Sequence, residues 1–156
     1  PAWIVASSTR ADGVMYAGKD NIHPKSLIAC AKDVYSKAGI THPRRQIDVA
    51  ELYVPFSWYE PMYLETLGIC DEGEGWKLTE AGATAMDGDI PINPSGGVLS
   101  SNPIGASGML RFGEAALQVR GMAGEHQVDG ARLALGHAFG GAHSYYAMWV
   151  VSADRP

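Results

Sequence analysis

The sequence has few cysteines, no net positive charge and no long apolar runs. The two cysteines, Cys30 and Cys70, have neither the number nor the spacing of a disulfide framework or a cysteine metal site. No apolar run reaches the ~18–20 residues that span a bilayer, and the first residues lack the layout of a secretory signal. The net charge of −5 leaves no basic surface for nucleic acid. We therefore expect a cytoplasmic protein that binds no metal, nucleic acid or membrane.

Apolar residues and glycine, by contrast, are abundant. With 46% hydrophobic residues among 156, residues 1–156 are expected to form one globular domain with a real core. The 19 glycines suggest that backbone lines a site. The sequence begins at Pro1 directly with an apolar segment and no methionine, from which we expect a part of a longer fold.

Hydrophobic periodicity predicts an alternation of strands and helices. Helices are expected at 24–38, 57–68 and 105–121; the first should end at Gly39, and Ser57 with Glu60 has capping-box spacing. Residues 70–92 and 136–143 are expected to be loops. Strands are expected at 3–8, 47–54, 97–100, 131–135 and 145–151. The order βαβαβαββ predicts an α/β fold, with a mixed, largely parallel sheet and helices on both faces.

The segment from Asn93 to Gly108 carries the clearest chemical signal. A strand is expected to lead into an Asn102–Pro103 turn, and a helix of small residues to begin at Gly105. Unpaired N–H groups at a helix start carry partial positive charge, which here would point toward Asn102. This turn could hold an anion, a thioester oxygen or an enolate. The alternative is that Asn102 only initiates the turn.

Four spaced blocks of the sequence are specific: 65–73 (ETLGICDEG), 92–97 (INPSGG), 118–128 (QVRGMAGEHQV) and 134–137 (ALGH). Together they resemble the thiolase superfamily, in particular its sterol-carrier-protein or lipid-transfer-protein type. The resemblance runs from Pro1 to Val151 and implies the C-terminal half of a thiolase. By this resemblance the family's nucleophilic cysteine belongs to the N-terminal half, which we do not expect among these residues, and neither Cys30 nor Cys70 lies in a motif that matches the one around that cysteine.

The resemblance assigns three positions to catalysis, and two of them depart from the family. The His-Asp-Cys-Phe motif is replaced here by residues 53–56, so that the phenol of Tyr53 stands where an imidazole would be. The histidine of the Gly-His-Pro turn is replaced by Asn102, which can donate an N–H but cannot take a proton at neutral pH. His137 is the acid/base candidate, and it is expected to stabilise a Tyr53 phenolate directly or through water. Substrate contacts are expected from Gly105, Gly140, Gly141 and His143.

For Tyr53 the alternative role is packing; His137 could also act as an orienting residue, and His143 could simply face solvent. An aromatic set after Tyr53 is expected to pack in the core or a dimer interface, or else to form a wall for a bulky apolar acyl group. The set consists of Phe56, Trp58, Tyr59 and Tyr63.

The altered positions imply carbon–carbon bond cleavage or formation at the β-position of a CoA thioester, with the thioester as substrate and no cofactor. Retro-aldol cleavage of a β-hydroxyacyl-CoA is favoured, as in the related steroid side-chain aldolases, because it needs only a base and an enolate stabiliser. The alternatives are a thiolase that uses a cysteine of the missing half, and a non-catalytic thiolase-like scaffold. The resemblance also implies a homodimer or hetero-oligomer, which could include a zinc-ribbon/OB-fold acyl-CoA-binding companion.

Overall fold

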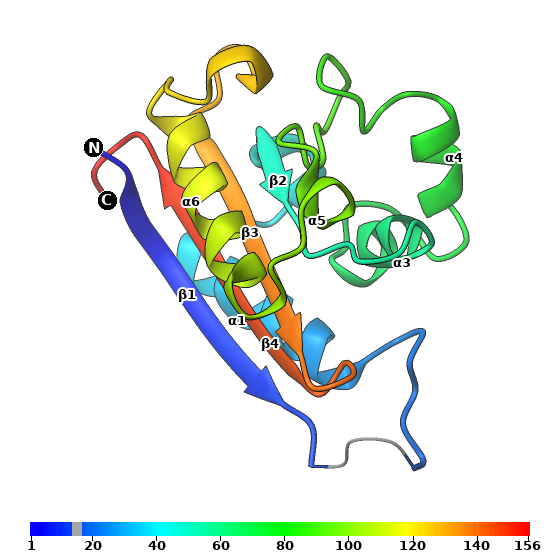
Figure 1. The fold of residues 1–156 in the computed structure, drawn as a ribbon. Helices are drawn as coiled ribbons and strands as arrows, with labels where there is room; N and C mark the ends of the chain where they lie inside the picture. Colours follow the sequence, from blue (N-terminus) through cyan, green and yellow to red (C-terminus); the bar gives the residue numbers. More distant parts are fainter. Residues whose placement is uncertain (14–16) are drawn as a thin grey trace.

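A four-stranded sheet in the order β1-β4-β3-β2 is the centre of the computed structural model, which describes residues 1–13 and 17–156 (Figure 1). β4 lies antiparallel between β1 and β3, and β2 is parallel to β3. Three strands therefore run in one direction and β4 alone opposes them, which confirms the mixed α/β fold. The bounds are β1 Trp3–Ala11, β2 Val49–Glu51, β3 Leu133–Gly140 and β4 Tyr145–Ser152.

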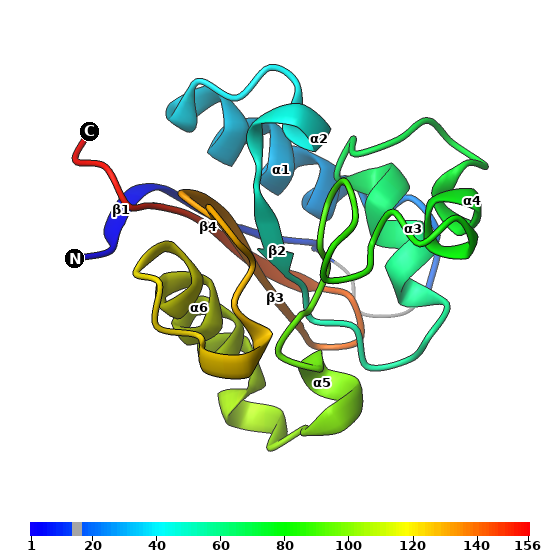
Figure 2. The ribbon, with the colours of Figure 1, turned by 90° about the horizontal axis from the view of Figure 1, so that it is seen from above.

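Helices cover both faces of the sheet, as Figure 2 shows with α1 and α6 on opposite sides. The helix expected before Gly39 is confirmed as α1 (Lys25–Ala38), and Gly39 ends it in the left-handed conformation with φ 68°. The third expected helix is α6 (Ser107–Val119), preceded by the 3-10 turn η1 (Ile104–Ala106). Shorter elements are α2 Pro43–Gln46, α3 Tyr59–Thr66, α4 Gly75–Glu80, α5 Gly97–Ser100 and η2 Gly124–His126.

Each face of the sheet has its own apolar core. Successive residues of a strand point to opposite faces, and thus the adjacent residues Ala134 and Leu135 belong to different cores. The core under α6 is small and includes Val49, Ala115, Val119, Ala134 and Val151. The core on the other face is larger, and it includes Leu27, Val34, Tyr63, Leu135 and Met148.

The strand expected at residues 97–100 is wrong: these residues form the single helical turn α5. Gly96 and Gly97 both have positive φ, 85° and 59°, which turns the chain out of an extended path. The residue that adds to the sheet lies earlier, where Ile92 makes a parallel bridge with Ala50.

Other expected boundaries also shift. The strand at 47–54 shortens to β2, whereas β3 continues through the expected loop as far as Gly140. The capping box at Ser57 is wrong, because α3 begins after Trp58 with no side-chain cap. The expected loop 70–92 contains the short helix α4. In the part of the chain that the structure describes, no helix is both long and apolar enough to cross a bilayer.

Candidate functional site

The backbone that leaves β2 is held in place by two polar side chains. The N–H of Leu52 donates to Asn93 Oδ1 at 2.6 Å, and the N–H of Tyr53 donates to His137 Nδ1 at 3.4 Å. These bonds replace the ladder bonds that the chain gives up when the strand ends. They fix Tyr53 at the carboxyl ends of the parallel strands β2 and β3, the edge at which sites of α/β sheets lie.

Tyr53 reaches Asn102 across this edge of the sheet. Its hydroxyl donates to Asn102 Oδ1 at 3.4 Å, and its ring packs edge-on against Phe139 with ring centres 4.7 Å apart. Tyr53 is buried in this chain, whereas Asn102 is exposed. The structure thus brings together two of the predicted catalytic residues, one from each side of the site.

The oxygen and the nitrogen of the Asn102 amide differ in their hydrogen bonds. Besides the Tyr53 hydroxyl, its Oδ1 accepts the backbone N–H of Ile104 at 3.1 Å and the Ser107 hydroxyl at 2.7 Å. Within the described residues no acceptor is recorded for its Nδ2. An asparagine amide carries two N–H donors on that nitrogen, so Asn102 has donors available for an incoming oxygen.

His137 contacts the backbone of Tyr53 and not its phenol. It is fully buried on β3, and burial, followed by the nearby His143, lowers its pKa to about 3. Because Nδ1 accepts the Tyr53 N–H, the neutral ring carries its proton on Nε2. A neutral imidazole bound to the backbone of Tyr53 is inconsistent with a direct cationic partner for a Tyr53 phenolate.

His143 belongs to a cluster of aromatic rings beside the site. Its Nδ1 lies 2.6 Å from the Tyr146 hydroxyl, and its ring stacks on Tyr59 with centres 4.6 Å apart. Burial, followed by the charge of Lys19, lowers the pKa of His143 to about 4. Phe139 contacts both His143 and Tyr53 and therefore links this cluster to the site.

The three predicted glycines lie in turns around the site. Gly105 is exposed in η1, three residues after Asn102. Gly140 and Gly141 begin the β3–β4 turn, and their carbonyls both accept the N–H of Ser144 at 3.1 Å. Only Gly141 has a positive φ, 56°, and a side chain there would meet the Tyr145 ring.

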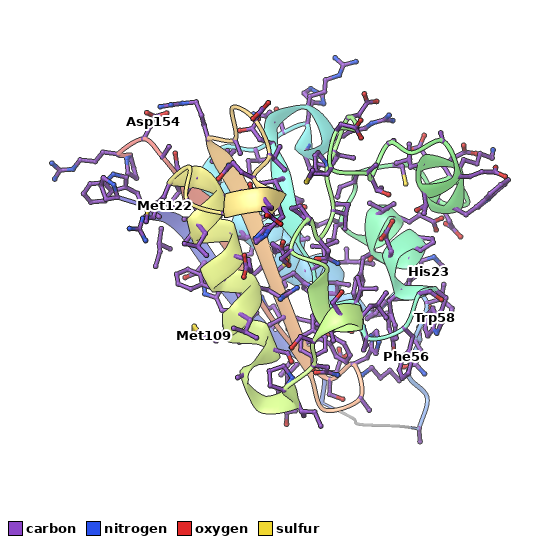
Figure 3. The ribbon with its side chains drawn as sticks, turned by 45° about the horizontal axis from the view of Figure 1, so that its top comes forward. His23, Phe56, Trp58, Met109, Met122 and Asp154 are labelled. Carbon is purple, nitrogen blue, oxygen red and sulfur yellow. The ribbon has the colours of Figure 1, made fainter. Side chains whose placement is uncertain are left out.

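The aromatic set after Tyr53 divides into buried and exposed members. Tyr59 and Tyr63 are buried, whereas Phe56 and Trp58 are 60% and 48% exposed and project outward (Figure 3). Trp58 stacks on Tyr59 with ring centres 4.0 Å apart. The buried pair packs in the core as expected, and the exposed pair leaves an apolar surface next to the loop that carries Tyr53.

The two thiols do not have the character of nucleophiles. Burial raises the pKa of Cys30, whose Sγ donates to the carbonyl of Ser8 at 3.4 Å. Burial and the nearby Glu65 raise the pKa of Cys70 to about 11. Both thiols therefore stay protonated at neutral pH, and a nucleophilic cysteine requires the reverse. Among the described residues, no group of three or more His, Cys, Asp or Glu is arranged to hold a metal ion.

An open hollow of about 1320 Å³ lies elsewhere, beside α2 and α4. Its lining mixes charges of both signs, including Arg44, Lys77 and Asp89, and contains no predicted site residue. We place the site at the end of β2 nevertheless, because the convergent polar contacts are there.

Sequence reasoning missed Ser107 and Phe139, which bind Asn102 and Tyr53 respectively. Ser107 lies in the same Gly-Ala-Ser-Gly segment that identified the helix start, so a signal was available for it. Phe139 was hidden because its segment was interpreted as a loop.

Comparison with known proteins gives consistent matches. Residues 9–153 match the family described as thiolase C-terminal domain-like. The chain is 32% identical over 154 residues to an acetyl-CoA acetyltransferase of Methanothermobacter thermautotrophicus, covering 97% of this chain and 40% of that protein. It is 43% identical over 111 residues to sterol carrier protein 2 of Homo sapiens, covering 70% of this chain and 20% of that protein.

Among solved structures, the Ltp2-ChsH2(DUF35) aldolase superposes with a TM-score of 0.82 at 23% identity, covering 100% of this chain and 40% of that chain. At this identity the likeness shows the fold. The chain spans two fifths or less of the length of each of these proteins.

Proposed function

This chain belongs to the thiolase C-terminal domain-like family, and from that premise we propose that it forms part of an enzyme that cleaves a β-hydroxyacyl-CoA by a retro-aldol reaction. The family expected from the sequence is confirmed. Relatives of the superfamily include acyltransferases and an aldolase, so the choice of reaction rests on the side chains of this chain. We take the cytoplasm as its location.

The observation that carries the proposal is the contact between Tyr53 and Asn102. A phenol and a primary amide meet at 3.4 Å where the family has histidines, and Asn102 keeps free donors on Nδ2. A retro-aldol site needs a group that takes the proton of the β-hydroxyl and donors that stabilise the enolate of the thioester. This pair can supply both without a covalent intermediate.

In the proposed reaction the Tyr53 hydroxyl first gives up its proton to solvent, and with it the long bond to Asn102, and the resulting phenolate accepts the proton of the β-hydroxyl. The bond between the α- and β-carbons then breaks, the β-carbon becomes a carbonyl, and the electron pair passes to the thioester enolate. The Nδ2 donors of Asn102 stabilise the enolate oxygen. The proton that Tyr53 accepted then passes to the α-carbon, which releases the shortened acyl-CoA and restores the phenolate. His137 holds the backbone of Tyr53 and takes no proton in this scheme.

Thiolysis is the second candidate, and the 32% identity to an acetyl-CoA acetyltransferase over nearly the whole chain favours it. It would require a nucleophilic cysteine from outside these residues, since Cys30 and Cys70 are held as thiols. In that case Asn102 would stabilise the thioester oxygen and Tyr53 would only pack beside it.

We also propose that the protein works in a larger assembly that includes the remainder of a thiolase fold and a DUF35 partner. The Ltp2-ChsH2(DUF35) aldolase, which carries such a partner in its name, supports this proposal by its fold. The zinc-ribbon/OB-fold companion that the resemblance implies would bring the acyl-CoA substrate. Native mass spectrometry of the purified protein would identify the subunits.

The test is Tyr53→Phe, which keeps shape and apolar area but removes the hydroxyl. We expect turnover of a β-hydroxyacyl-CoA to fall by roughly 10²–10⁴ while binding of the CoA ester stays within about threefold. Tyr145→Phe is the matched control, because Tyr145 is 53% exposed on β4 and should leave turnover unchanged. Retained activity of Tyr53→Phe together with a dependence on added CoA would instead support thiolysis.

A further inference from the structure

Ser107, the first residue of α6, directs its hydroxyl at the site. It is completely buried, and its Oγ donates to Asn102 Oδ1 at 2.7 Å, the shortest of the three bonds to that oxygen. A buried hydroxyl costs free energy unless it is paired, so this bond is the partner that Ser107 needs. Because α6 packs on β3, the hydroxyl is also fixed relative to the sheet.

Ile104 supplies a second, independent donor to the same oxygen. It has a φ of 48°, a conformation that β-branched residues rarely adopt, although its side chain is 76% exposed and gains little from burial. In this conformation its N–H points to Asn102 Oδ1 at 3.1 Å. A backbone N–H can only donate, so this bond identifies the accepting end of the amide whichever way the hydroxyls turn.

From these contacts we infer that Ser107 is a positioning residue: it holds the Asn102 amide in place, while the Ile104 N–H sets the orientation, with the oxygen inward and the NH₂ toward the substrate. Rotation of the amide by 180° would place Nδ2 against the Ile104 N–H, so that two donors face each other. The Ser107 hydroxyl would then have to turn and accept a hydrogen bond from Nδ2. The fixed orientation keeps the donors ready before the substrate arrives, which is what electrostatic stabilisation of an enolate requires. The catalytic consequence of this inference rests on the proposed function, whereas the fixed orientation of the Asn102 amide, which we call the lock, rests on geometry alone.

The first test is kinetic and uses the protein in its native assembly. Ser107→Ala should lower kcat roughly tenfold with KM within about twofold, less than the roughly 10²–10³-fold loss expected for Asn102→Ala. In the Asn102→Ala background, Ser107→Ala should have no further effect, because the two residues act as one unit. Ser100→Ala, at an exposed position of α5, is the matched control and should change nothing. Additive losses, or a rise in KM with unchanged kcat, would overturn the inference.

The second test does not depend on the reaction. In protein labelled with ¹⁵N-asparagine, Asn102→Asp identifies the side-chain NH₂ signals of Asn102 by removing them. Ser107→Ala should shift these signals, while those of Asn93, whose Oδ1 accepts the Leu52 N–H, should stay in place. Unmoved Asn102 signals would overturn the lock. Shifted signals in a protein inactive on every CoA ester would retain the lock and reject the proposed function instead.

Discussion

Polar side chains that accept backbone N–H groups shape this site residue by residue. Asn93 and His137 accept the N–H groups of the loop residues Leu52 and Tyr53, and Asn102 accepts the N–H of Ile104 at the start of η1. Loops have no ladder to satisfy their donors, so these side chains take the place of a neighbouring strand. The site is thereby built by residues that stay neutral at pH 7, and Tyr53 is left as the residue that exchanges a proton in the proposed reaction.

Burial of His137 makes a prediction for stability in acid. Its pKa is about 3 in the folded protein and about 6.5 when unfolded, so the unfolded chain binds the proton first as the pH falls. Protonation of His137 therefore leaves the free energy of unfolding unchanged above pH ~6.5. Between pH ~6.5 and pH ~3 it lowers that free energy by roughly 1.4 kcal/mol per pH unit. His143, whose pKa is about 4, acts in the same direction.

His137→Gln should therefore flatten the decline of the free energy of unfolding between pH 6 and pH 4 by about 1.4 kcal/mol per pH unit. Urea denaturation at several pH values measures this slope. His42→Gln, at an exposed position before α2, is the control and should keep the slope of the unmodified protein. An unchanged slope in His137→Gln would mean that the folded protein already binds this proton.

At the scale of elements, the spacing between α6 and β3 depends on small side chains. On β3 the residues that face α6 are Ala134, Gly136 and Ala138, and larger residues alternate with them. On the helix, Gly108 is so close that a methyl group there would lie 2.7 Å from the Cβ of Ala138. This close approach brings the start of α6, and with it Ser107 and Asn102, next to the end of β2.

Gly108→Ala should consequently destabilise the protein by about 1–3 kcal/mol, because the helix start must move away from β3. Gly113→Ala is the matched control in the same helix, since a methyl group there meets nothing within 4 Å. It should stabilise by about 0.5–1 kcal/mol through helix propensity alone. Thermal unfolding of both variants measures the difference, and equal shifts in Tm would contradict the close packing.

At the scale of the whole molecule, one buried ion pair joins the sheet to the α6 layer. Arg111 of α6 lies 3.0 Å from the carboxylate of Glu51 on β2, and both side chains are almost completely buried. Ser95 donates to the same carboxylate through its N–H at 3.1 Å and its Oγ at 2.8 Å. Burial raises the pKa of Glu51 even though Arg111 and Ser95 oppose the shift. The pair fixes the loop before α5 and the exit of β2 in one geometry.

Removal of one partner should be costly. Arg111→Leu leaves a buried carboxylate without its cation and should destabilise the protein by about 3–5 kcal/mol. The double variant Glu51→Gln/Arg111→Met should recover a large part of that loss, because no buried charge remains. Chemical denaturation of the single and double variants compares them. A double variant less stable than Arg111→Leu would show that the ion pair itself, and not the penalty of an unpaired charge, stabilises the fold.

The outer side of α5, η1 and α6 remains apolar and exposed in this chain. Leu99, Ile104 and Met109 are each more than 60% exposed, and Figure 3 shows Met109 projecting outward from the start of α6. In this chain the sheet covers one side of α6. Since the chain spans two fifths or less of the relatives compared, coverage of the other side by the rest of a thiolase fold stays a prediction.

The sequence by itself determined the features that depend on neighbours along the chain. The helical period before Gly39 predicted α1, the turn chemistry of Asn102–Pro103 located one side of the site, and the spaced blocks identified the family. It could also have extended β3, because large residues alternate from Leu133 to Phe139, but Gly136 and Gly140 suggested a loop.

Only the tertiary structure decided which atoms meet. Residues 97–100 have the composition of a strand, but paired positive φ angles at Gly96 and Gly97 take them out of the sheet and leave Ile92 to pair instead. His137 looked like a titrating residue at a strand end, and burial together with the Tyr53 N–H makes it a neutral acceptor. The Asn102 amide is likewise oriented by the Ile104 N–H and held by the hydroxyls of Ser107 and, far away in the sequence, of Tyr53. Protonation and amide orientation are set by the three-dimensional surroundings of a group, which a pattern along the chain does not contain.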